Sequence, residues 1–424
     1  MIYNADGEFN HHRAQVVWCA PMNVNDWIPL ASSADQALAE LAKATGSAAI
    51  RALDGATLLC ERAMRAGMRI PERTSAGGGC HLFDAIGDTI ALNLARPCDR
   101  EMLPALFETD GLDTKDDAAI AARIERLDAH ALVLRGRSMG LAIGAEDETR
   151  LAPGGDGNDV AWTAWVELVC GCHSSTLARS TPRVVDLSAL WAGPLAAHLL
   201  WLAGAEVVKV ESRARPDAMR DAQSDFYALL NQGKASVALD LANRVDRHAL
   251  LTLIGASDIV IEASRPRALA QLGIDAAQIV RTTPGLVWVS ITAHGAEGDA
   301  ADWVGFGDDC AVSGGLSAAL RAVTGRTGFV GDALADPLTG IFAALAAWQT
   351  WNSGRGARLG LAMSQIVARC LAAVRQEDPD RLRSCLNAWG RAVGKPFPTV
   401  THRSIGTLPS FAADTRSCLA RFAR

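Results

Sequence analysis

One segment, residues 183–211, constrains the fold more than any other part of the chain. It reads RVVDLSALWAGPLAAHLLWLAGAEVVKVE. The β-branched run VVDLS is typical of a buried parallel strand, and Ala192-Gly193-Pro194 is a loop whose proline suits the first position of a helix. A helix is expected over 195–203, and after Gly204 the run VVKV returns to strand character. The segment therefore predicts a βαβ unit, whose loop is a common place for a phosphate-bearing ligand although it lacks the G-x-G-x-x-G of dinucleotide sites.

Three further buried-strand runs follow, at 236–242, 258–263 and 285–292. Helical patterns long enough for a crossover separate them, and this alternation predicts an α/β fold with a Rossmann-like, doubly wound parallel sheet. Before the sheet, helical periodicity over 33–69 indicates two helices separated near Gly46, and two strand patterns flank a turn at Gly87-Asp88. We expect this first part of the chain to form a second, smaller α+β domain.

A chain of 424 residues is too long for one core of ordinary size, so two or three domains are expected. A glycine-rich stretch at 153–158 is the clearest linker signal. The predicted divisions are a small domain with the N-terminal helices and a glycine-rich loop at 1–160, a linker at 161–181, a Rossmann-like ligand domain at 182–360 and a C-terminal helical tail at 361–424.

The composition argues against several classes of protein. A net charge of −6 argues against general nucleic-acid binding. Ten cysteines are scattered without a repeating framework, which favours reduced thiols and a cytoplasmic location. The one cysteine cluster, Cys170-Gly-Cys172-His173, has no further ligands at a compatible spacing, so no metal is expected.

Membrane association and secretion are not expected either. The first fifteen residues are polar and acidic where a secretory signal needs a basic start followed by an apolar run. The most apolar window, residues 189–205, is interrupted by Pro194 and His198 and lies inside the βαβ pattern.

Two pairs of aspartates are the candidates for chemistry. Asp332 and Asp336 lie four residues apart just before an apolar helix, where an aspartate commonly only caps the helix. A carboxylate at such a place is also a possible nucleophile towards a thioester, with backbone N–H groups to stabilise an oxyanion. Asp308-Asp309 is a second pair, open to general acid–base service or to simple solvation. Spacing alone does not choose between these roles.

Several motifs in unbroken order over residues 183–360 resemble the family III CoA-transferases (CaiB/BaiF type), a family that includes formyl-CoA transferases and α-methylacyl-CoA racemases. The motifs are the opening βαβ unit, FYALLNQGKASVALDL, DIVIEASRPRALAQLGI, PGLVWVSITAHG and GDALADPLTG. The resemblance implies transfer of CoA from an acyl-CoA donor to a carboxylic acid, through anhydride and thioester intermediates on an aspartate. It places that nucleophile at Asp336 and leaves Asp332 as a helix cap.

The resemblance extends to the first part of the chain. In SAGGGCHLF, Gly77, Gly78 and Gly79 match a glycine-rich loop that closes over the family's active site, although the family usually carries its small domain after the nucleotide-binding fold. The family also implies a homodimer, often interlocked. Small-molecule acyl-CoA and acid partners are therefore expected, with no nucleic acid and no membrane partner.

For CoA itself, the resemblance implicates the first loop, the ends of two strands and one lysine. Guanidinium and ammonium groups suit the phosphates of CoA, and a strand-end crevice suits its adenine. The implicated residues are Trp191, Ala192, Gly193, Pro194, Ser212, Arg213, Lys234, Ala263, Ser264 and Arg265. Trp191 stands where formyl-CoA transferases carry a catalytic glutamine.

Two alternatives stay open. One is an α-methylacyl-CoA racemase or epimerase, which uses a histidine and an aspartate for proton transfer; His294 is the nearest candidate, although a turn histidine is the simpler interpretation. The other is a CoA-binding protein without catalysis, favoured by the altered order of the segments and by Trp191.

Overall fold

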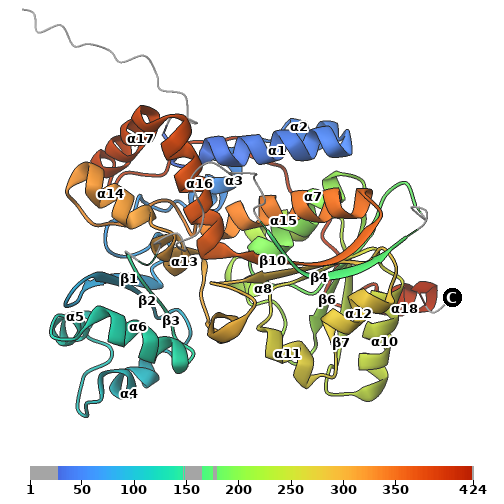
Figure 1. Ribbon diagram of the computed structural model, residues 1–424, viewed down its shortest axis with the longest axis horizontal. Coiled ribbons are helices and arrows are strands. Elements are labelled where there is room, and N and C mark those ends of the chain that lie inside the picture. Colours follow the sequence, from blue (N-terminus) through green and yellow to red (C-terminus); the bar gives the residue numbers. More distant parts are fainter. Residues whose placement is uncertain (1–26, 147, 149–164, 175–178, 423–424) are drawn as a thin grey trace, which may run out of the picture.

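The computed structural model describes residues 27–146, 148, 165–174 and 179–422. Two sheets organise these residues (Figure 1). The larger has seven strands in the order β4-β10-β9-β8-β5-β6-β7, all parallel except for the edge pair β4 and β10. Its strands are β4 (Val166–His173), β5 (Arg183–Asp186), β6 (Glu206–Ser212), β7 (Ala235–Leu239), β8 (Ile259–Glu262), β9 (Val287–Thr292) and β10 (Arg355–Ala362).

Residues of the parallel strands alternate between two cores. Val184 and Ile261 belong to one core, whereas Val185 and Val260 belong to the other, because successive side chains of a strand point to opposite faces. The face that contains Val185 is covered by α10 (Arg244–Gly255), α11 (Pro266–Gln271), α12 (Ala276–Thr282) and α18 (Thr415–Phe422). Helices on both faces make this a doubly wound α/β sheet, as the sequence predicts.

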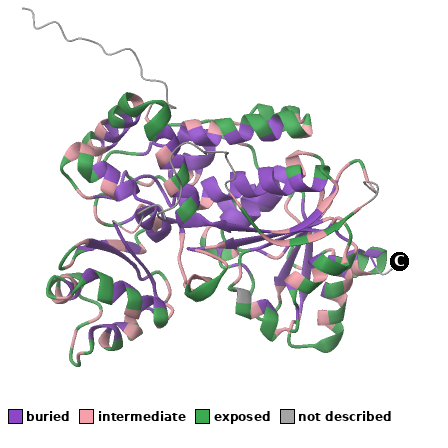
Figure 2. Ribbon diagram, in the orientation of Figure 1, coloured by how far each residue is buried: buried purple, intermediate pink, exposed green. Residues whose placement is uncertain are grey.

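The face that contains Val184 carries the larger core. It is built on α7 (Ala192–Leu202), α9 (Ser224–Asn231) and α15 (Ala335–Asn352), and α15 is buried along almost its whole length (Figure 2). Further helices of this core are α1 (Ala31–Thr45), α3 (Gly55–Arg65), α14 (Leu316–Thr324), α16 (Met363–Glu377) and α17 (Pro379–Arg391). Short helices α2 (Ala48–Arg51) and α8 (Met219–Ala222) and the 3-10 turn η3 (Gly298–Asp302) complete this part.

The predicted βαβ unit is confirmed as β5, α7 and β6, but its helix begins three residues before the predicted start. Pro194 is therefore the third helical residue, and Trp191 is the residue at the helix N-cap. Glycine determines how closely α7 and α15 approach. A Cβ added to Gly340 would lie 2.6 Å from the carbonyl oxygen of Ala192, so only glycine permits this contact.

The smaller sheet has three antiparallel strands, β1 (Cys80–Asp84), β2 (Thr89–Asn93) and β3 (Ala142–Ala145). One face packs on α4 (Leu103–Phe107), α5 (Asp117–Ile124) and α6 (Ala129–Ser138), with the 3-10 turn η2 (Arg100–Met102) alongside. The other face meets α13 (Gly307–Ser313) through Val312, and Phe329 joins the same cluster. The predicted hairpin is confirmed, since Asp84 pairs with Thr89 across the turn.

The N-terminal helices lie with the larger sheet. Helix α1 runs beside α15 in Figure 1 and shares its core, whereas the core of the small domain draws on residues 83–145. The predicted linker region also contributes β4, an edge strand of the large sheet. We therefore propose a division by cores in which the small domain begins near residue 79. The linker signal at 153–158 lies outside the described residues.

No helix among the described residues is both long and apolar enough to cross a membrane.

Candidate functional site

Asp336 is the second residue of α15 and is partly exposed. The backbone N–H of Ala192, the first residue of α7, donates a hydrogen bond to its carboxylate. Two helix N-termini therefore meet at this carboxylate, and each carries partial positive charge. Gly307 lies against the same group, since a Cβ there would be 2.2 Å from the Asp336 Oδ2 atom. The Oδ2 atom of Asp336 therefore lies next to the backbone of Gly307, where there is no room for a side chain.

The environment of Asp336 raises its pKa to about 7. Burial is the largest cause, because it disfavours the charged form, and the neighbouring carboxylates of Asp308 and Asp332 act in the same direction. The guanidinium of Arg62 and the N–H of Ala192 oppose them. Such a carboxyl changes charge near neutral pH, which is a common property of groups at catalytic sites.

Asp332 does not cap the helix, so that prediction is wrong. The N-cap residue of α15 is Leu334, without a side-chain hydrogen bond, and Asp332 is fully buried. Its Oδ2 atom accepts a hydrogen bond of 2.8 Å from the Nε atom of Arg62, and its Oδ1 atom accepts a second one from Nη2. The pair is bidentate because the guanidinium fork matches a carboxylate.

Arg62 comes from the last turn of α3, 270 residues before its partner. Sequence reasoning misses it, because no local motif marks an arginine that completes a distant site. Its guanidinium carbon lies 4.6 Å from the ring centroid of Trp191, a distance typical of a cation–π contact. Trp191 is itself buried and meets Phe226 edge to face.

The glycine loop lies beside this cluster. The N–H of Ser75 donates to the carbonyl of Cys80 at 2.8 Å, which closes the loop around Gly77, Gly78 and Gly79. Gly78 has a φ of 77°, a conformation that favours glycine. A Cβ on Gly77 would lie 3.7 Å from the Nη2 atom of Arg62. The structure thus brings the predicted loop and the predicted nucleophile to one place in a single chain.

Asp308 connects the glycine loop to the aspartate loop. Its carboxylate accepts hydrogen bonds from the Ser75 hydroxyl and from the N–H of Ala333, the latter at 3.0 Å. Burial and the charge of Asp332 raise its pKa to about 6. Asp309 points elsewhere: it accepts from the N–H of Phe306 at 3.0 Å and from Asn93 at 3.2 Å. Burial raises the pKa of Asp309 to about 7.

Two residues near the site have an unusual backbone conformation. Leu190, just before Trp191, has a φ of 66°, and Ala333, three residues before Asp336, has a φ of 47°. Each is held by a carboxylate, because the N–H of Leu190 donates to Asp217 and that of Ala333 donates to Asp308. Left-handed backbone at non-glycine residues is strained and tends to gather at functional sites.

The strand-end residues implicated in CoA binding follow two strands that flank β5. Ser212 ends β6 and Arg213 follows it, exposed; Ala263, Ser264 and Arg265 follow β8, and Ala263 and Arg265 are exposed. Ser264 donates to Glu262 at 3.0 Å. The first-loop residues Trp191, Ala192, Gly193 and Pro194 are buried at the start of α7.

Arg265 belongs to a cationic cluster, which we define as Arg96, Arg215, Arg265 and Arg267. Partial burial lowers the pKa of Arg265 below its usual value, and the charges of the other three arginines lower it further, against one opposing carboxylate, Asp302. Arg96 follows β2 in the small domain, so both domains contribute to the cluster. Sequence reasoning finds only Arg265 of the four.

Lys234 lies away from solvent. Its ammonium donates to the Oδ2 atom of Asp186 at 2.9 Å, to the carbonyl of Pro194 at 2.9 Å and to the Oδ1 atom of Asn231 at 3.0 Å. An ammonium has three donors, and all three have protein partners here. In this environment burial lowers the pKa of Lys234 to about 8. Lys234 thus ties the start of α7 to β5, and its predicted contact with CoA gains no support from this geometry.

Among the described residues, one group of potential metal ligands converges: atoms of His294, Asp309 and Cys310 lie within 4.8 Å of one another. The guanidinium of Arg137 lies 3.4 Å from the Nε2 atom of His294, and the Nδ1 atom lies 3.2 Å from the Ser364 hydroxyl. A guanidinium at that position disfavours a second cation. Burial, followed by the charge of Arg137, lowers the pKa of His294 to about 3.

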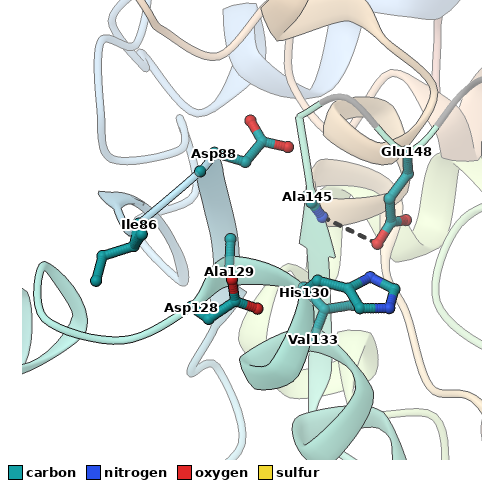
Figure 3. Close-up of a pocket in the computed structure, with 9 residues that line it drawn as sticks. Ile86, Asp88, Asp128, Ala129, His130, Val133, Ala145 and Glu148 are labelled. Atoms are coloured by element: carbon teal, nitrogen blue, oxygen red, sulfur yellow. Dashed lines mark hydrogen bonds between the residues drawn. The ribbon is translucent and has the colours of Figure 1, made fainter.

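A cavity of about 470 Å³ lies on the small domain (Figure 3). Its lining includes the hairpin turn at Gly87 and Asp88, the start of α6 at Asp128 and His130, and Glu148, which accepts a hydrogen bond from the N–H of Ala145. None of the residues predicted for the site lines it, so the cavity and the aspartate cluster are separate features.

Comparison with protein families identifies residues 180–380 as matching CoA-transferase family III. A succinyl-CoA–D-citramalate CoA-transferase of Chloroflexus aurantiacus is 31% identical over 189 residues, which is 41% of this chain and 46% of that protein. A formyl-CoA:oxalate CoA-transferase of Afipia carboxidovorans is 29% identical, over 47% of this chain and 49% of the relative. The chain thus spans about half the length of the curated relatives it matches.

One further relative and one solved structure are similar over comparable shares. A succinate–glutarate CoA-transferase of Agrobacterium fabrum is 29% identical, over 45% of this chain and 52% of that protein. A hypothetical protein of Mycobacterium tuberculosis, known from a crystal structure, aligns with a TM-score of 0.42 and 25% identity, over 51% of this chain and 61% of that one.

Proposed function

Because residues 180–380 of the chain belong to CoA-transferase family III, we propose that the protein moves CoA from an acyl-CoA donor to a carboxylic acid, with Asp336 as the nucleophile. The observation that carries this proposal is the carboxylate of Asp336 at the N-terminus of α15, where it accepts the N–H of Ala192 and feels the charge of Arg62, the residue that Gly77 of the glycine loop approaches. The relatives' names supply substrates to test: succinyl-CoA and formyl-CoA as donors, and oxalate, glutarate and citramalate as acceptors.

The reaction begins with attack of an Asp336 oxygen on the thioester carbonyl carbon. A C–O bond forms, the C–S bond breaks, and the CoA thiolate leaves behind a mixed anhydride. The thiolate then attacks the carbonyl carbon of Asp336 and releases the donor's carboxylate, which leaves an aspartyl thioester. The acceptor carboxylate then attacks the aspartyl thioester, which forms a second mixed anhydride and releases the CoA thiolate. The thiolate attacks the acceptor's carbonyl carbon in this anhydride, which yields the new acyl-CoA and restores the Asp336 carboxylate. No proton is gained or lost over the cycle.

The surrounding groups suit these steps. Only the ionised carboxylate is nucleophilic, and a pKa of about 7 leaves a large fraction of Asp336 ionised at neutral pH. The oxyanions that form on either carbonyl face the N-terminal ends of α7 and α15, where backbone N–H groups and the helix dipoles favour negative charge. The glycine loop, beside Arg62, shields the anhydride from water, which would otherwise hydrolyse it.

CoA is proposed to lie along the carboxyl ends of β5, β6 and β8. In parallel sheets, ligands bind in the crevice outside these ends. Arg213, Arg215 and Arg265 supply positive charge for the phosphates, whereas Arg96 and Arg267 of the cationic cluster pair with Asp99 and Asp302. We leave Lys234 out of this set, because protein acceptors occupy its three donors. A homodimer is also proposed from the family, and light scattering on the purified chain tests it.

The first test compares two aspartates that are each the second residue of a helix. Asp336→Asn should abolish transfer, a loss of roughly a thousandfold or more because the nucleophile is gone, and should leave CoA affinity within about twofold. Asp380→Asn at the start of α17 is the matched control and should keep full activity. Mass spectrometry after incubation with the donors should find the acyl or CoA adduct on Asp336. Full activity in Asp336→Asn would overturn the assignment.

The same panel separates the two other candidate functions. A racemase exchanges the α-proton of a 2-methylacyl-CoA in deuterated water without an acceptor acid, whereas a transferase needs the acid for net turnover. Binding of CoA with neither exchange nor transfer, over all donors and acceptors, would mark a non-catalytic protein. Both outcomes would contradict the proposal.

A further inference from the structure

Arg62 is the cation at the centre of the aspartate cluster. Its side chain is 14% exposed, and its Nε and Nη2 atoms both bind Asp332. The carboxylates of Asp332, Asp308 and Asp336 hold the pKa of Arg62 above its usual value, although burial acts against its charge. One guanidinium therefore sits among three carboxylates. The field at Asp336 depends on where that guanidinium is held.

Two contacts hold it, one on its edge and one on its face. Asp332 binds the edge through the bidentate pair, and the guanidinium carbon lies over the ring of Trp191, 4.6 Å from its centroid. Trp191 is in turn fixed by Phe226 and by its place as the residue at the N-cap of α7, directly before the Ala192 N–H that binds Asp336. The stack and the nucleophile thus share one short piece of backbone.

The charged groups around Asp336 come from three elements. Helix α3 brings Arg62, helix α13 brings Asp308, and the loop before α15 brings Asp332; helix α7 adds the N–H of Ala192. Arg62 lowers the pKa of Asp336, whereas Asp308 and Asp332 raise it, and the effect of Arg62 is larger than that of either carboxylate. The cation opposes both carboxylates and the burial of Asp336.

We propose that Arg62, clamped by Asp332 and stacked on Trp191, is a positioning residue that keeps Asp336 ionised for its attack on the thioester. The inference rests on the proposed transferase function. Trp191 supplies the flat platform that the guanidinium needs, which gives this residue a physical role of its own at the first loop. Lysine is a poor replacement, because an ammonium neither stacks flat on the ring nor forms the bidentate pair.

The inference predicts pH profiles that move in opposite directions. In Arg62→Gln the acid limb of the transfer rate moves to higher pH by roughly 1 to 3 pH units. This is the range by which a nearby guanidinium lowers a carboxyl pKa. At pH 6.5 the rate then falls by about tenfold or more. In Asp332→Asn the amide oxygen still accepts a hydrogen bond from Arg62, while a carboxylate that repels the charge of Asp336 is gone, so the limb moves to lower pH. Arg62→Lys falls between wild type and Arg62→Gln.

Controls and a direct readout complete the experiment. Arg51→Gln removes an exposed arginine from the end of α2 and should leave the profile unchanged. Infrared difference titration follows the protonated carboxyl band that disappears in Asp336→Asn, and its midpoint should shift with the kinetic limb. Limbs of Arg62→Gln and Asp332→Asn that stay in place or move together would overturn the inference, because a purely structural role lowers the rate without opposite shifts.

The titration also separates this inference from the proposed function. If wild-type protein transfers no CoA in the panel but the Asp336 band shifts as stated, the transferase proposal fails and the charge assignment stands. If wild-type protein is active and the band of Arg62→Gln keeps its midpoint, the function stands and Arg62 does not set the charge of Asp336.

Discussion

Two buried ion pairs flank the start of α7, and they differ in what surrounds them. Lys234 and Asp186 are both almost completely buried, and every donor of Lys234 has a protein partner. Arg62 also pairs with a fully buried aspartate, Asp332, but its guanidinium faces further carboxylates, a tryptophan ring and an exposed glycine loop. We call the first pair saturated, because every donor of its cation is occupied. In the second pair the charge of Arg62 also acts on the carboxylates of Asp308 and Asp336.

The pKa values of the carboxyls beside the two cations are shifted in opposite directions. Burial alone would raise the pKa of Asp186, but the ammonium groups of Lys234 and Lys209 hold it below its usual range. Asp336, beside Arg62, has its pKa raised to about 7, since burial outweighs the guanidinium it shares with two other carboxylates. At Asp186 the neighbouring cations outweigh burial, whereas at Asp336 one guanidinium is divided among three carboxylates and burial dominates.

The largest expected effect on stability comes from breaking the saturated pair of Lys234 and Asp186. Lys234→Met leaves Asp186 buried without its main partner, which should lower the free energy of unfolding by about 3–5 kcal/mol. Urea unfolding at pH 7 measures it, with Lys115→Met, an exposed lysine, as the control. Adding Asp186→Asn should recover part of the loss, because it removes the unpaired charge. A Lys234→Met protein of normal stability but weak CoA affinity would instead support the phosphate contact inferred from the sequence motif.

A smaller effect of opposite sign is expected at Asp336. Its pKa is higher in the folded state than the usual value of about 4, so its contribution to stability is fully present below about pH 4 and is lost as the pH rises through about 7. At pH 8 the ionised, buried carboxylate of Asp336 therefore destabilises the folded state. Asp336→Asn removes this destabilisation and should raise the free energy of unfolding at pH 8 by about 1–3 kcal/mol, with little change at pH 4.

Urea unfolding at the two pH values, with Asp380→Asn as the control, measures the effect. An equal change at both values would mean that Asp336 is not held with a raised pKa. The gain in stability on loss of the proposed nucleophile would also show that this region carries strain for function, as the left-handed Leu190 and Ala333 indicate.

Local patterns in the sequence are enough to predict five of the seven strands of the large sheet, β5 to β9, and the alternation of strands and helices. The unit β5, α7 and β6, the hairpin of β1 and β2, and the break at Gly46 after α1 all follow from residue types within a few positions of one another. Strands β4 and β10 escape prediction. The sequence RGARLGLA of β10 mixes glycine and arginine with apolar residues, and it becomes a strand because β9 and β4 supply its hydrogen-bonding partners.

The site divides in the same way. Asp336 and the glycine loop carry recognisable motifs, and the fold brings them together. Arg62 carries none, since its role depends on a partner 270 residues away and on the ring of Trp191. Lys234 shows the opposite case: its motif suggests a ligand contact, whereas in the structure its ammonium is buried and donates to three protein acceptors. Charge at a site depends on solvent and neighbours, which a motif does not record.

The smallest expected effect is a shift in the pH dependence of the transfer rate when Trp191 is replaced. Trp191→Phe keeps an aromatic face for Arg62, whereas Trp191→Gln removes it and supplies the glutamine that formyl-CoA transferases carry there. A cation–π contact in this setting contributes about 1 kcal/mol, which corresponds to less than about one pH unit in the acid limb of the rate. Trp191→Gln should move that limb to higher pH, in the direction of Arg62→Gln, while Trp191→Phe leaves it nearly in place. The saturated pair is the internal control, because Trp191→Gln should not change the pKa of Asp186. If Trp191→Gln instead raises the rate at every pH without moving the limb, the residue acts on the substrate directly and Arg62 does not depend on it.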